Sequence, residues 1–299
     1  MKNMTDEALI QELTRRLTGS DELRNNYQSL MDELNLVNKK LEESEALKSH
    51  FISNITNEII NPFASILGLS KAILSVDKEN WKKVLSMVAL IYTEAFNLDF
   101  QLKNIFAAAR IEAGEMNPEI AKVDIFNLIR SIVERFKIEA KKKKVKIDTV
   151  FEINLHEARS SFFFKTDVEK LNLILLNLLN NALKYSFEEG LITIKVWQKE
   201  GDLFISVKDR GIGLSDEHKK IIFDRFRRVD SAITSTNRGH GLGLSINKAL
   251  LDILDGQINI ESQPGEGSNF IIQLPETPDD PFLTADDDNE LFFNDKQVF

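Results

Sequence analysis

Asn177-Leu-Leu-Asn-Asn181-Ala-Leu-Lys184-Tyr185 decides how the C-terminal half of the chain folds, because its leucines repeat at helical spacing beside regularly placed polar residues. Asn177, Asn181 and Lys184 are separated by four and three residues, so they project from one side of a helix. Mg²⁺ prefers oxygen ligands and retains water, so amide oxygens could hold the hydrated ion while the ammonium meets a phosphate. Taken alone, the motif fits an ordinary polar surface beside a leucine-rich core face equally well.

A second motif, Asp209-Arg-Gly211-Ile-Gly213, follows a predicted strand that ends at Lys208. A carboxylate at the end of a strand can accept a hydrogen bond from an exocyclic amine. Glycines beside it let the backbone approach a flat ring closely. The motif therefore predicts a place for a nucleobase.

Two further motifs lie between this point and the next helix. In Ile222-Phe-Asp-Arg225-Phe226 the arginine could reach phosphate oxygens, while the aromatic residues are better explained as packing. Gly239-His-Gly241-Leu242-Gly243 opens a helix, where consecutive backbone N–H groups and the helix dipole favour an anion. The chain contains no Gly-x-x-x-x-Gly-Lys-Ser/Thr, so a P-loop is excluded.

Helical and alternating segments surround these motifs after Pro118. Helical periodicity predicts helices over Ile125 to Lys143, Leu171 to Tyr185 and Gly243 to Leu254. Period-two alternation predicts strands around Val145, Ile192, Leu203, Ile258 and Phe270, with turns at Gly201-Asp202 and Pro264-Gly265. We expect an α/β sandwich in which helices pack on one face of a single sheet.

The N-terminal part is predicted to be helical. Apolar residues from Leu23 to Leu41 alternate steps of four and three, which is typical of a parallel coiled coil. A long helix with a kink at Pro62 and a second helix from about Asn80 to Ala113 predict an αα-hairpin whose dimer is a four-helix bundle. The predicted division is residues 1–45 for an N-terminal helix and coiled coil, 46–116 for the hairpin, 120–275 for the α/β domain and 276–299 for an acidic tail.

The four motifs, in this order and spacing, resemble the N, G1, F and G2 boxes of the histidine kinase ATP-binding domain of the GHKL ATPase family. Gly265-Glu-Gly267-Ser-Asn-Phe270 is similar to the segment that commonly follows. The resemblance implies ATP and Mg²⁺ as cofactors, with Asn181 contributing to the metal, Lys184 and Tyr185 flanking the nucleotide, Asp209 reading adenine, and Gly241 and Gly243 in a mobile lid. It also assigns Asn177, Gly211, Gly213, Arg225, Gly239 and Leu242 to the nucleotide site.

The first predicted hairpin helix, Phe51-Ile-Ser-Asn-Ile-Thr-Asn57-Glu58-Ile-Ile-Asn61-Pro62, resembles the dimerisation and phosphoacceptor helix of the sensor histidine kinases. That family usually has Ser/Thr-His-Glu-x-x-Thr/Asn-Pro here, so Asn57 stands where the phosphoacceptor histidine belongs. An amide nitrogen has its lone pair delocalised into the carbonyl and cannot replace imidazole as a nucleophile. We therefore expect no phosphohistidine at position 57, and Glu58 has no imidazole to orient.

Asn61 keeps the position from which the family orients a water that removes phosphate from a response-regulator aspartate. That task needs a polar group to position a nucleophile, so a phosphatase role stays open. A simple polar residue before the proline is an equally good explanation. His50 lies two helical turns before Asn57 and is a weaker candidate for a displaced acceptor.

Three functions follow from these features. The first is a two-component signalling protein that acts on a response-regulator receiver, as a phosphatase or as a trans-acting kinase, in a homodimer or in a heterodimer with another histidine kinase. The second is a non-catalytic, ATP-gated dimeric scaffold that regulates a partner kinase. A chaperone- or topoisomerase-like ATPase is disfavoured, because the helical hairpin lies immediately upstream.

Composition limits the remaining possibilities. The chain has 299 residues, 42% of them hydrophobic, and no apolar run that reaches the ~20 residues of a membrane-spanning helix. The absence of cysteine excludes thiolate chemistry, and a net charge of -9 argues against a nucleic-acid surface. No secretory signal is apparent, so a cytoplasmic location is expected. The tail fits either a disordered solubilising end or a short docking peptide.

Overall fold

The computed structural model describes residues 26–39, 42, 59–76, 80–153, 161–224 and 241–276. The chain divides into two compact units, Met1–Ile55 and Thr56–Phe299. In the first unit, residues 26–39 are helical, and Tyr27, Leu30, Leu34 and Val37 expose more than half of their surface. These are the apolar positions of the predicted coiled coil. The predicted helix before Leu23 and the acidic tail after Glu276 lie outside the described residues. None of the described helices combines the length and apolar character needed to cross a membrane.

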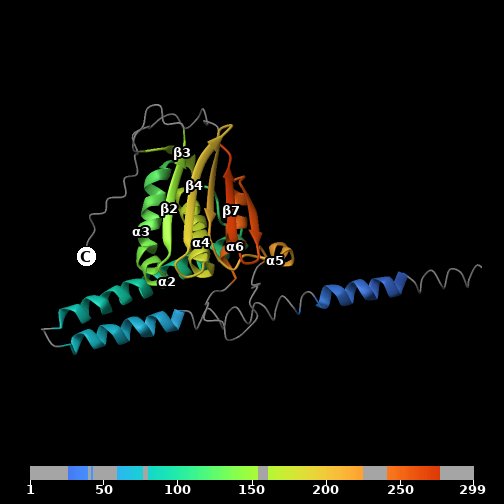
Figure 1. Cartoon of the computed structure of the whole chain (residues 1–299). Coiled ribbons are helices and arrows are strands. Elements are labelled where there is room, and N and C mark those ends of the chain that lie inside the picture. The colour runs from blue at the N-terminus through green and yellow to red at the C-terminus, as the bar shows by residue number, and fades with distance from the viewer. Residues whose placement is uncertain are drawn as a thin grey trace, which may run out of the picture. The chain divides into compact units, whose positions relative to one another are not determined.

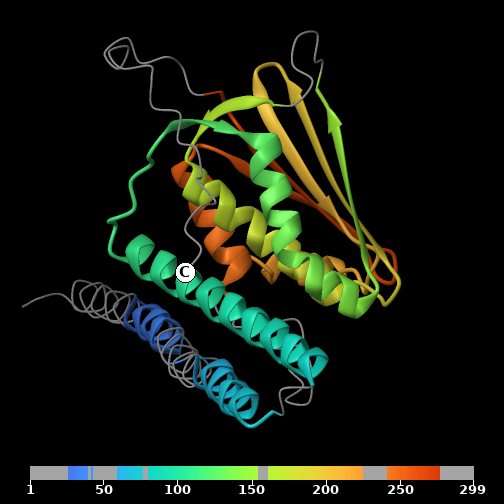
Figure 2. The same ribbon diagram turned by 90° about the vertical axis from the view of Figure 1, so that its left-hand side faces the viewer.

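The second unit opens with a helical hairpin, as predicted. Residues 59–74 form one helix, and α2 (Trp81–Glu112) runs for 32 residues without interruption. The two helices lie side by side in both views (Figures 1 and 2). Pro62 is buried within the described part of the earlier helix. The predicted continuation of that helix from Phe51 to Glu58 lies outside the described residues.

A five-stranded sheet follows, in the order β2-β4-β5-β7-β6. Its strands are β2 (Lys146–Glu152), β4 (Leu191–Lys199), β5 (Asp202–Lys208), β6 (Gln257–Gln263) and β7 (Gly267–Leu274). The β2–β4 pair is parallel, and the other three pairs are antiparallel. Gly201 (φ 92°) and Gly265 (φ 81°) form the two hairpin turns at their predicted places, with backbone conformations that favour glycine.

Three helices, α3 (Ile125–Lys143), α4 (Val168–Tyr185) and α6 (Gly243–Ile253), cover one face of this sheet (Figure 2). The inward residues of the strands are completely buried against them, including Ile192, Leu203, Ile205 and Ile272. The predicted bounds of α3 are confirmed. Helix α4 begins three residues earlier than predicted, because Asp167 caps it by accepting a hydrogen bond from the Lys170 backbone.

Three short elements were not predicted. β1 (Ala121–Asp124) and β3 (Phe163–Thr166) form a separate antiparallel pair, and α5 (Asp216–Ile221) begins at an N-cap, Ser215. Four-residue strands and a six-residue helix are too short to show a clear period in the sequence. The first two exist because each pairs with a segment about 40 residues away.

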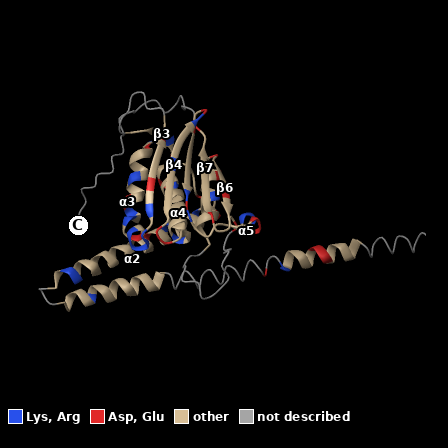
Figure 3. Cartoon of the chain, in the orientation of Figure 1, with Lys and Arg blue, Asp and Glu red and all other residues tan. Residues whose placement is uncertain are grey.

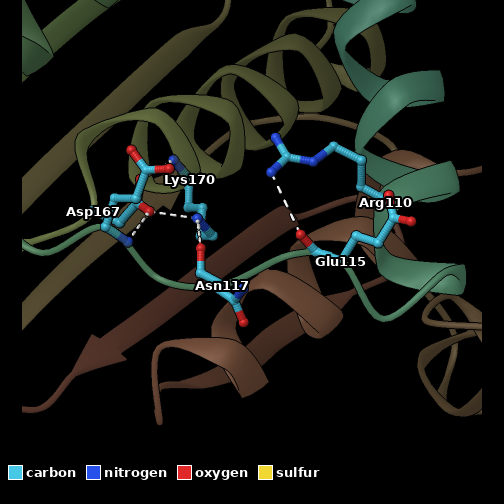
Figure 4. A network of polar contacts seen from close by, with 6 residues as sticks. Arg110, Glu115, Asn117, Asp167 and Lys170 are labelled. Atoms are coloured by element: carbon cyan, nitrogen blue, oxygen red, sulfur yellow. Dashed lines mark hydrogen bonds and ion pairs between the residues drawn. The ribbon is translucent and has the colours of Figure 1, made fainter.

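The segment that connects the hairpin to the sheet domain is held by a buried ion pair (Figure 4). Nζ of Lys170 contacts both the carboxylate of Asp167 and the carbonyl oxygen of Asn117, the latter at 2.7 Å. Asp167 also accepts a hydrogen bond of 2.8 Å from the Glu119 backbone. The connecting segment is therefore fastened to the first turn of α4.

Helix α2 also packs against the sheet domain directly. The ring of Phe96 meets the ring of Phe136, on α3, edge to face at 5.4 Å. Phe100, Asn104 and Ala107, one helical face of α2, are buried. The hairpin and the ATPase-like domain thus share an apolar contact in addition to the covalent connection.

Candidate functional site

Asp209 follows the last residue of β5 and is 4% exposed. Its Oδ1 atom is buried and has no hydrogen-bond partner. Burial raises the pKa of this carboxyl to about 6. A hydrogen bond with the Ser268 backbone and the positive charge of Lys143 lower the pKa, but their effect is smaller than that of burial. An unpaired buried acceptor is costly to maintain, so this oxygen is suited to an incoming N–H donor.

The two glycines after Asp209 lie in a loop that leaves no room for side chains. A Cβ atom on Gly211 would stand 2.1 Å from the carbonyl oxygen of Tyr185, and one on Gly213 would stand 1.9 Å from that of Gln263. The backbone N–H of Ile212 donates to the Tyr185 carbonyl at 3.2 Å. The loop is therefore clamped between the end of α4 and the β6–β7 hairpin, which fixes the position of Asp209.

The polar face of α4 lies beside this loop. Lys184 and Tyr185 end the helix, with Nζ of Lys184 5.0 Å from the centre of the Tyr185 ring. Asn181, one turn earlier, is half-buried. The C-terminal end of α4 thus brings Tyr185 next to Gly211, and Asn181 and Lys184 lie within about one helical turn of Tyr185.

Asn177 has an additional role that the sequence did not indicate. It is 3% exposed, and its Nδ2 donates a hydrogen bond of 2.9 Å to Oδ1 of Asn247, on α6. Nδ2 of Asn247 in turn donates to the carbonyl oxygen of Ile174 at 3.1 Å. Asn177 therefore ties α4 to α6. Asn247 belongs to none of the four sequence motifs, so the sequence analysis did not identify it.

The start of α6 carries the fourth motif. Gly241 has φ 69°, Leu242 is buried, and a Cβ atom on Gly243 would stand 3.0 Å from Oδ1 of Asn177. The N-terminus of α6 therefore begins against the polar face of α4, where its free N–H groups favour an anion. Arg225 and Gly239, the other predicted residues of this region, lie outside the described residues.

The β6–β7 hairpin supports the site with a small hydroxyl cluster that sequence reasoning missed. Oγ of Ser262 accepts from the Leu214 backbone at 2.8 Å and contacts Oγ of Ser268 at 2.9 Å. A Cβ atom on Gly267 would stand 2.2 Å from the carbonyl oxygen of Asp209. Glycine at this position thus allows β7 to approach the acidic residue, which supports the predicted relevance of this segment.

The remaining predicted residues belong to the hairpin. Asn61 is exposed on the helix of residues 59–74. Asn57, Glu58 and His50 lie outside the described residues. The structure therefore gathers the α4, β5 and α6 motifs around one end of α4 and leaves Asn61 on a separate element.

Similarity to known proteins agrees with this geometry. Residues 166–278 match the family model described as histidine kinase-, DNA gyrase B-, and HSP90-like ATPase. Over 239 residues the chain is 28% identical to the circadian input-output histidine kinase CikA of Synechocystis sp., an alignment that covers 77% of this chain and 31% of that protein. It is 30% identical over 264 residues to the autoinducer 2 sensor kinase/phosphatase LuxQ of Vibrio cholerae, covering 85% and 30% respectively.

The fold is also found in a solved structure, that of full-length ShkA in complex with AMPPNP, with a TM-score of 0.53. The two chains are 23% identical, and the match covers 79% of this chain and 46% of that chain. The fold and the site together define an ATPase domain of the histidine kinase-, gyrase- and HSP90-like class. The chain spans about a third of the length of the two relatives just named, and over that part it is similar to sensor histidine kinases.

Proposed function

We propose that this chain binds ATP with Mg²⁺ and acts in two-component signalling without phosphorylating itself at position 57. The proposal rests on Asp209, whose buried and unpaired oxygen is held in place by a glycine loop packed against the carbonyl oxygens of Tyr185 and Gln263. Such an acceptor fits the exocyclic amine of adenine. Lys184 and the N-terminus of α6 would then bind the phosphates.

Magnesium would be held mainly through Asn181 and the phosphates themselves. No cluster of three or more His, Cys, Asp or Glu side chains that could hold a metal occurs in the described ranges. A half-buried amide oxygen is a suitable Mg²⁺ ligand, because the ion keeps most of its waters and takes few protein ligands. When bound, the ion would screen the phosphate charge. Asn177 is less available for this task because its amide already engages Asn247.

A second copy of a histidine kinase hairpin is the partner proposed for the helical hairpin. Phe63, Leu67, Val88, Tyr92 and Phe106 expose 48–63% of their surface, although they lie on helices of a well-packed unit. Pairing two hairpins would bury these residues in a four-helix bundle. Leu67→Glu should convert the dimer to a monomer in sedimentation, whereas Lys141→Glu, at an exposed position of α3 outside the hairpin, should not.

Asn57 argues against self-phosphorylation at this position. Phosphoryl transfer from ATP to a side chain needs a nucleophile with an available lone pair, which the amide lacks. A kinase role is therefore proposed only in trans, on the histidine of a partner in a heterodimer. Two-component receivers are the proposed downstream partners.

Asn61 supports a phosphatase role. It is exposed on the hairpin helix immediately before Pro62, so it could approach a docked receiver. Its amide could orient a water toward an aspartyl phosphate, a step that needs no histidine at position 57. The name of LuxQ, a sensor kinase/phosphatase, shows that both activities occur in a relative. The alternative is a non-catalytic scaffold in which ATP only sets the geometry of the dimer.

Labelled ATP separates these possibilities. The purified chain with ATP-Mg²⁺ labelled at the γ-phosphate should acquire no acid-labile label. With a phosphorylated receiver, it should remove label, and Asn61→Ala should abolish the removal. Acid-labile label that persists in His50→Ala and disappears in Asn57→Ala would overturn the proposed loss of self-phosphorylation at position 57, whereas label that disappears in His50→Ala would place the acceptor at His50. A chain that neither transfers nor removes phosphate with any partner kinase or receiver would support the scaffold.

A further inference from the structure

Lys143, the last residue of α3, differs from the lysines around it. Lys141 and Lys142 are exposed, and lysines mark this end of the helix (Figure 3). Lys143 is instead half-buried, and its Nζ donates hydrogen bonds of 2.8 Å to the carbonyl oxygens of both Leu183 and Lys184. A lysine gives up hydration and side-chain freedom in such a position, so its contacts must compensate.

The two carbonyls that Lys143 contacts belong to the last turn of α4. The final carbonyls of a helix lack internal partners and carry the negative end of its dipole, so an ammonium is a favourable partner there. The segment that follows α4 is held at the same end of α3. The Glu189 backbone donates to the carbonyl of Lys143 at 3.4 Å, and Lys144 forms an ion pair of 2.9 Å with Glu189.

Lys143 also acts on Asp209 through its charge. Burial lowers the pKa of the Lys143 ammonium, while the negative charges of Glu188 and Asp209 raise it. In return, the charge of Lys143 lowers the pKa of Asp209, whose burial has the opposite and larger effect. Among the described charged side chains, Lys143 is the one that favours the ionised form of Asp209. Glu188, at the surface, acts on Lys143 through its negative charge.

We infer that Lys143 is a positioning residue of the nucleotide site, which links the C-terminal carbonyls of α4 to Asp209 and keeps that residue a hydrogen-bond acceptor for adenine. The inference rests on the proposed role of Asp209 in binding adenine. It adds a residue outside all four sequence motifs. The physical reason is that a protonated carboxyl group presents a donor toward the amine and can no longer accept on that oxygen.

Lys143→Gln is the informative variant, because the amide keeps N–H donors for the two carbonyls but removes the charge. Its affinity for ADP-Mg²⁺ should be measured by calorimetry from pH 5.5 to 8.5 in the full chain. Loss of one nearby opposite charge should move the acidic midpoint of affinity upward by about one pH unit. That shift corresponds to roughly threefold weaker binding at pH 6.5, with recovery above pH 8.

Controls separate this role from simple support of the helix. Lys143→Arg keeps the charge and should retain the wild-type pH profile, as should Lys141→Gln at the exposed position of the same turn. The carboxyl carbon of Asp209, followed by NMR without nucleotide, should titrate at a higher pH in Lys143→Gln. This second measurement needs no ligand. If Lys143→Gln does not fold, the same titration of Asp209 is followed in Lys143→Met, which also lacks the charge.

The outcomes are distinguishable. A Lys143→Gln profile parallel to wild type, weakened equally at all pH values or not at all, would overturn this inference and leave the nucleotide site intact. An unshifted Asp209 titration would do the same. Wild-type protein without affinity for adenine nucleotides would instead overturn the proposed function.

Discussion

The side-chain amide of Asn177 donates to Oδ1 of Asn247 at 2.9 Å, and this buried pair joins α4 to α6. Asn247 is fully buried, and its own amide reaches the carbonyl oxygen of Ile174. Both helices carry glycine or polar motifs of the site. Their relative position therefore depends on one satisfied amide network.

Replacing Asn247 by leucine should destabilise the chain. The substitution removes the acceptor of Nδ2 of Asn177 in the core and the second hydrogen bond of the Ile174 carbonyl, which costs about 1–3 kcal/mol. Denaturant unfolding monitored by circular dichroism would measure the loss. Lys248→Ala, at the exposed neighbouring position, should change the free energy of unfolding by less than about 0.5 kcal/mol. Equal effects of the two substitutions would contradict the structural role of the pair.

Asp209→Asn should stabilise the protein without nucleotide at neutral pH. The carboxyl has a pKa of about 6 when folded and about 4 when unfolded, so the unfolded state loses its proton first and stability falls as the pH rises between these values. Above pH 6 the full penalty, at most about 3 kcal/mol, applies to wild type and is absent in the variant. Thermal unfolding at pH 4 and pH 8 measures the difference, which should vanish at pH 4.

The same variant should weaken adenine nucleotide binding roughly 10- to 100-fold, because a hydrogen bond to a charged acceptor is replaced by one to an amide. Calorimetry with ADP-Mg²⁺ tests this. A more stable protein with unchanged affinity would show that Asp209 is not the adenine acceptor.

Gly213→Ala should be far more damaging than Gly265→Ala, although both glycines have positive φ angles. A Cβ atom on Gly213 would stand 1.9 Å from the Gln263 carbonyl oxygen, whereas one on Gly265 meets nothing within 4 Å. We expect a loss of about 3 kcal/mol for the first and about 1 kcal/mol for the second. Urea midpoints of the two variants provide the comparison. Equal losses would mean that the β6–β7 hairpin does not clamp the loop.

Lys170→Met should release the segment that connects the hairpin to the ATPase domain. Burial raises the pKa of Asp167, but hydrogen bonds from Lys170 and Glu119 outweigh it and hold that pKa below its usual value. Removing the ammonium leaves a buried carboxylate without its partner, at a cost of about 3 kcal/mol at neutral pH. The folded-state pKa is the lower one, so this contribution is complete above about pH 4 and is lost as the pH falls further.

The matched control is Lys137→Met, which removes the exposed ion pair with Glu134 and should cost less than about 1 kcal/mol. Proteolysis next to Asn117 should accelerate in Lys170→Met alone. Similar stability and cleavage for both variants would show that the buried pair does not fasten the connecting segment.

Much of the architecture follows from local patterns. The helix from Ile125 to Lys143 has the predicted bounds because its apolar period is regular, and the tight turns at Gly201 and Gly265 appear where the sequence places them. The motifs around Asp209, Lys184 and Gly243 meet at one end of α4, as their order implied. β1, β3 and α5 escaped prediction because they are too short to show a period.

Sequence alone determined the class of fold, because helical and alternating periods are properties of residue type and spacing. It also predicted the motifs of the nucleotide site and, through the family resemblance, Asn57 at the phosphoacceptor position. Only the tertiary structure decided that Asn177 pairs with Asn247 and that Lys143 reaches the last turn of α4. These contacts join segments 40 to 73 residues apart. Their strength comes from burial, which exists only after the helices have packed on the sheet.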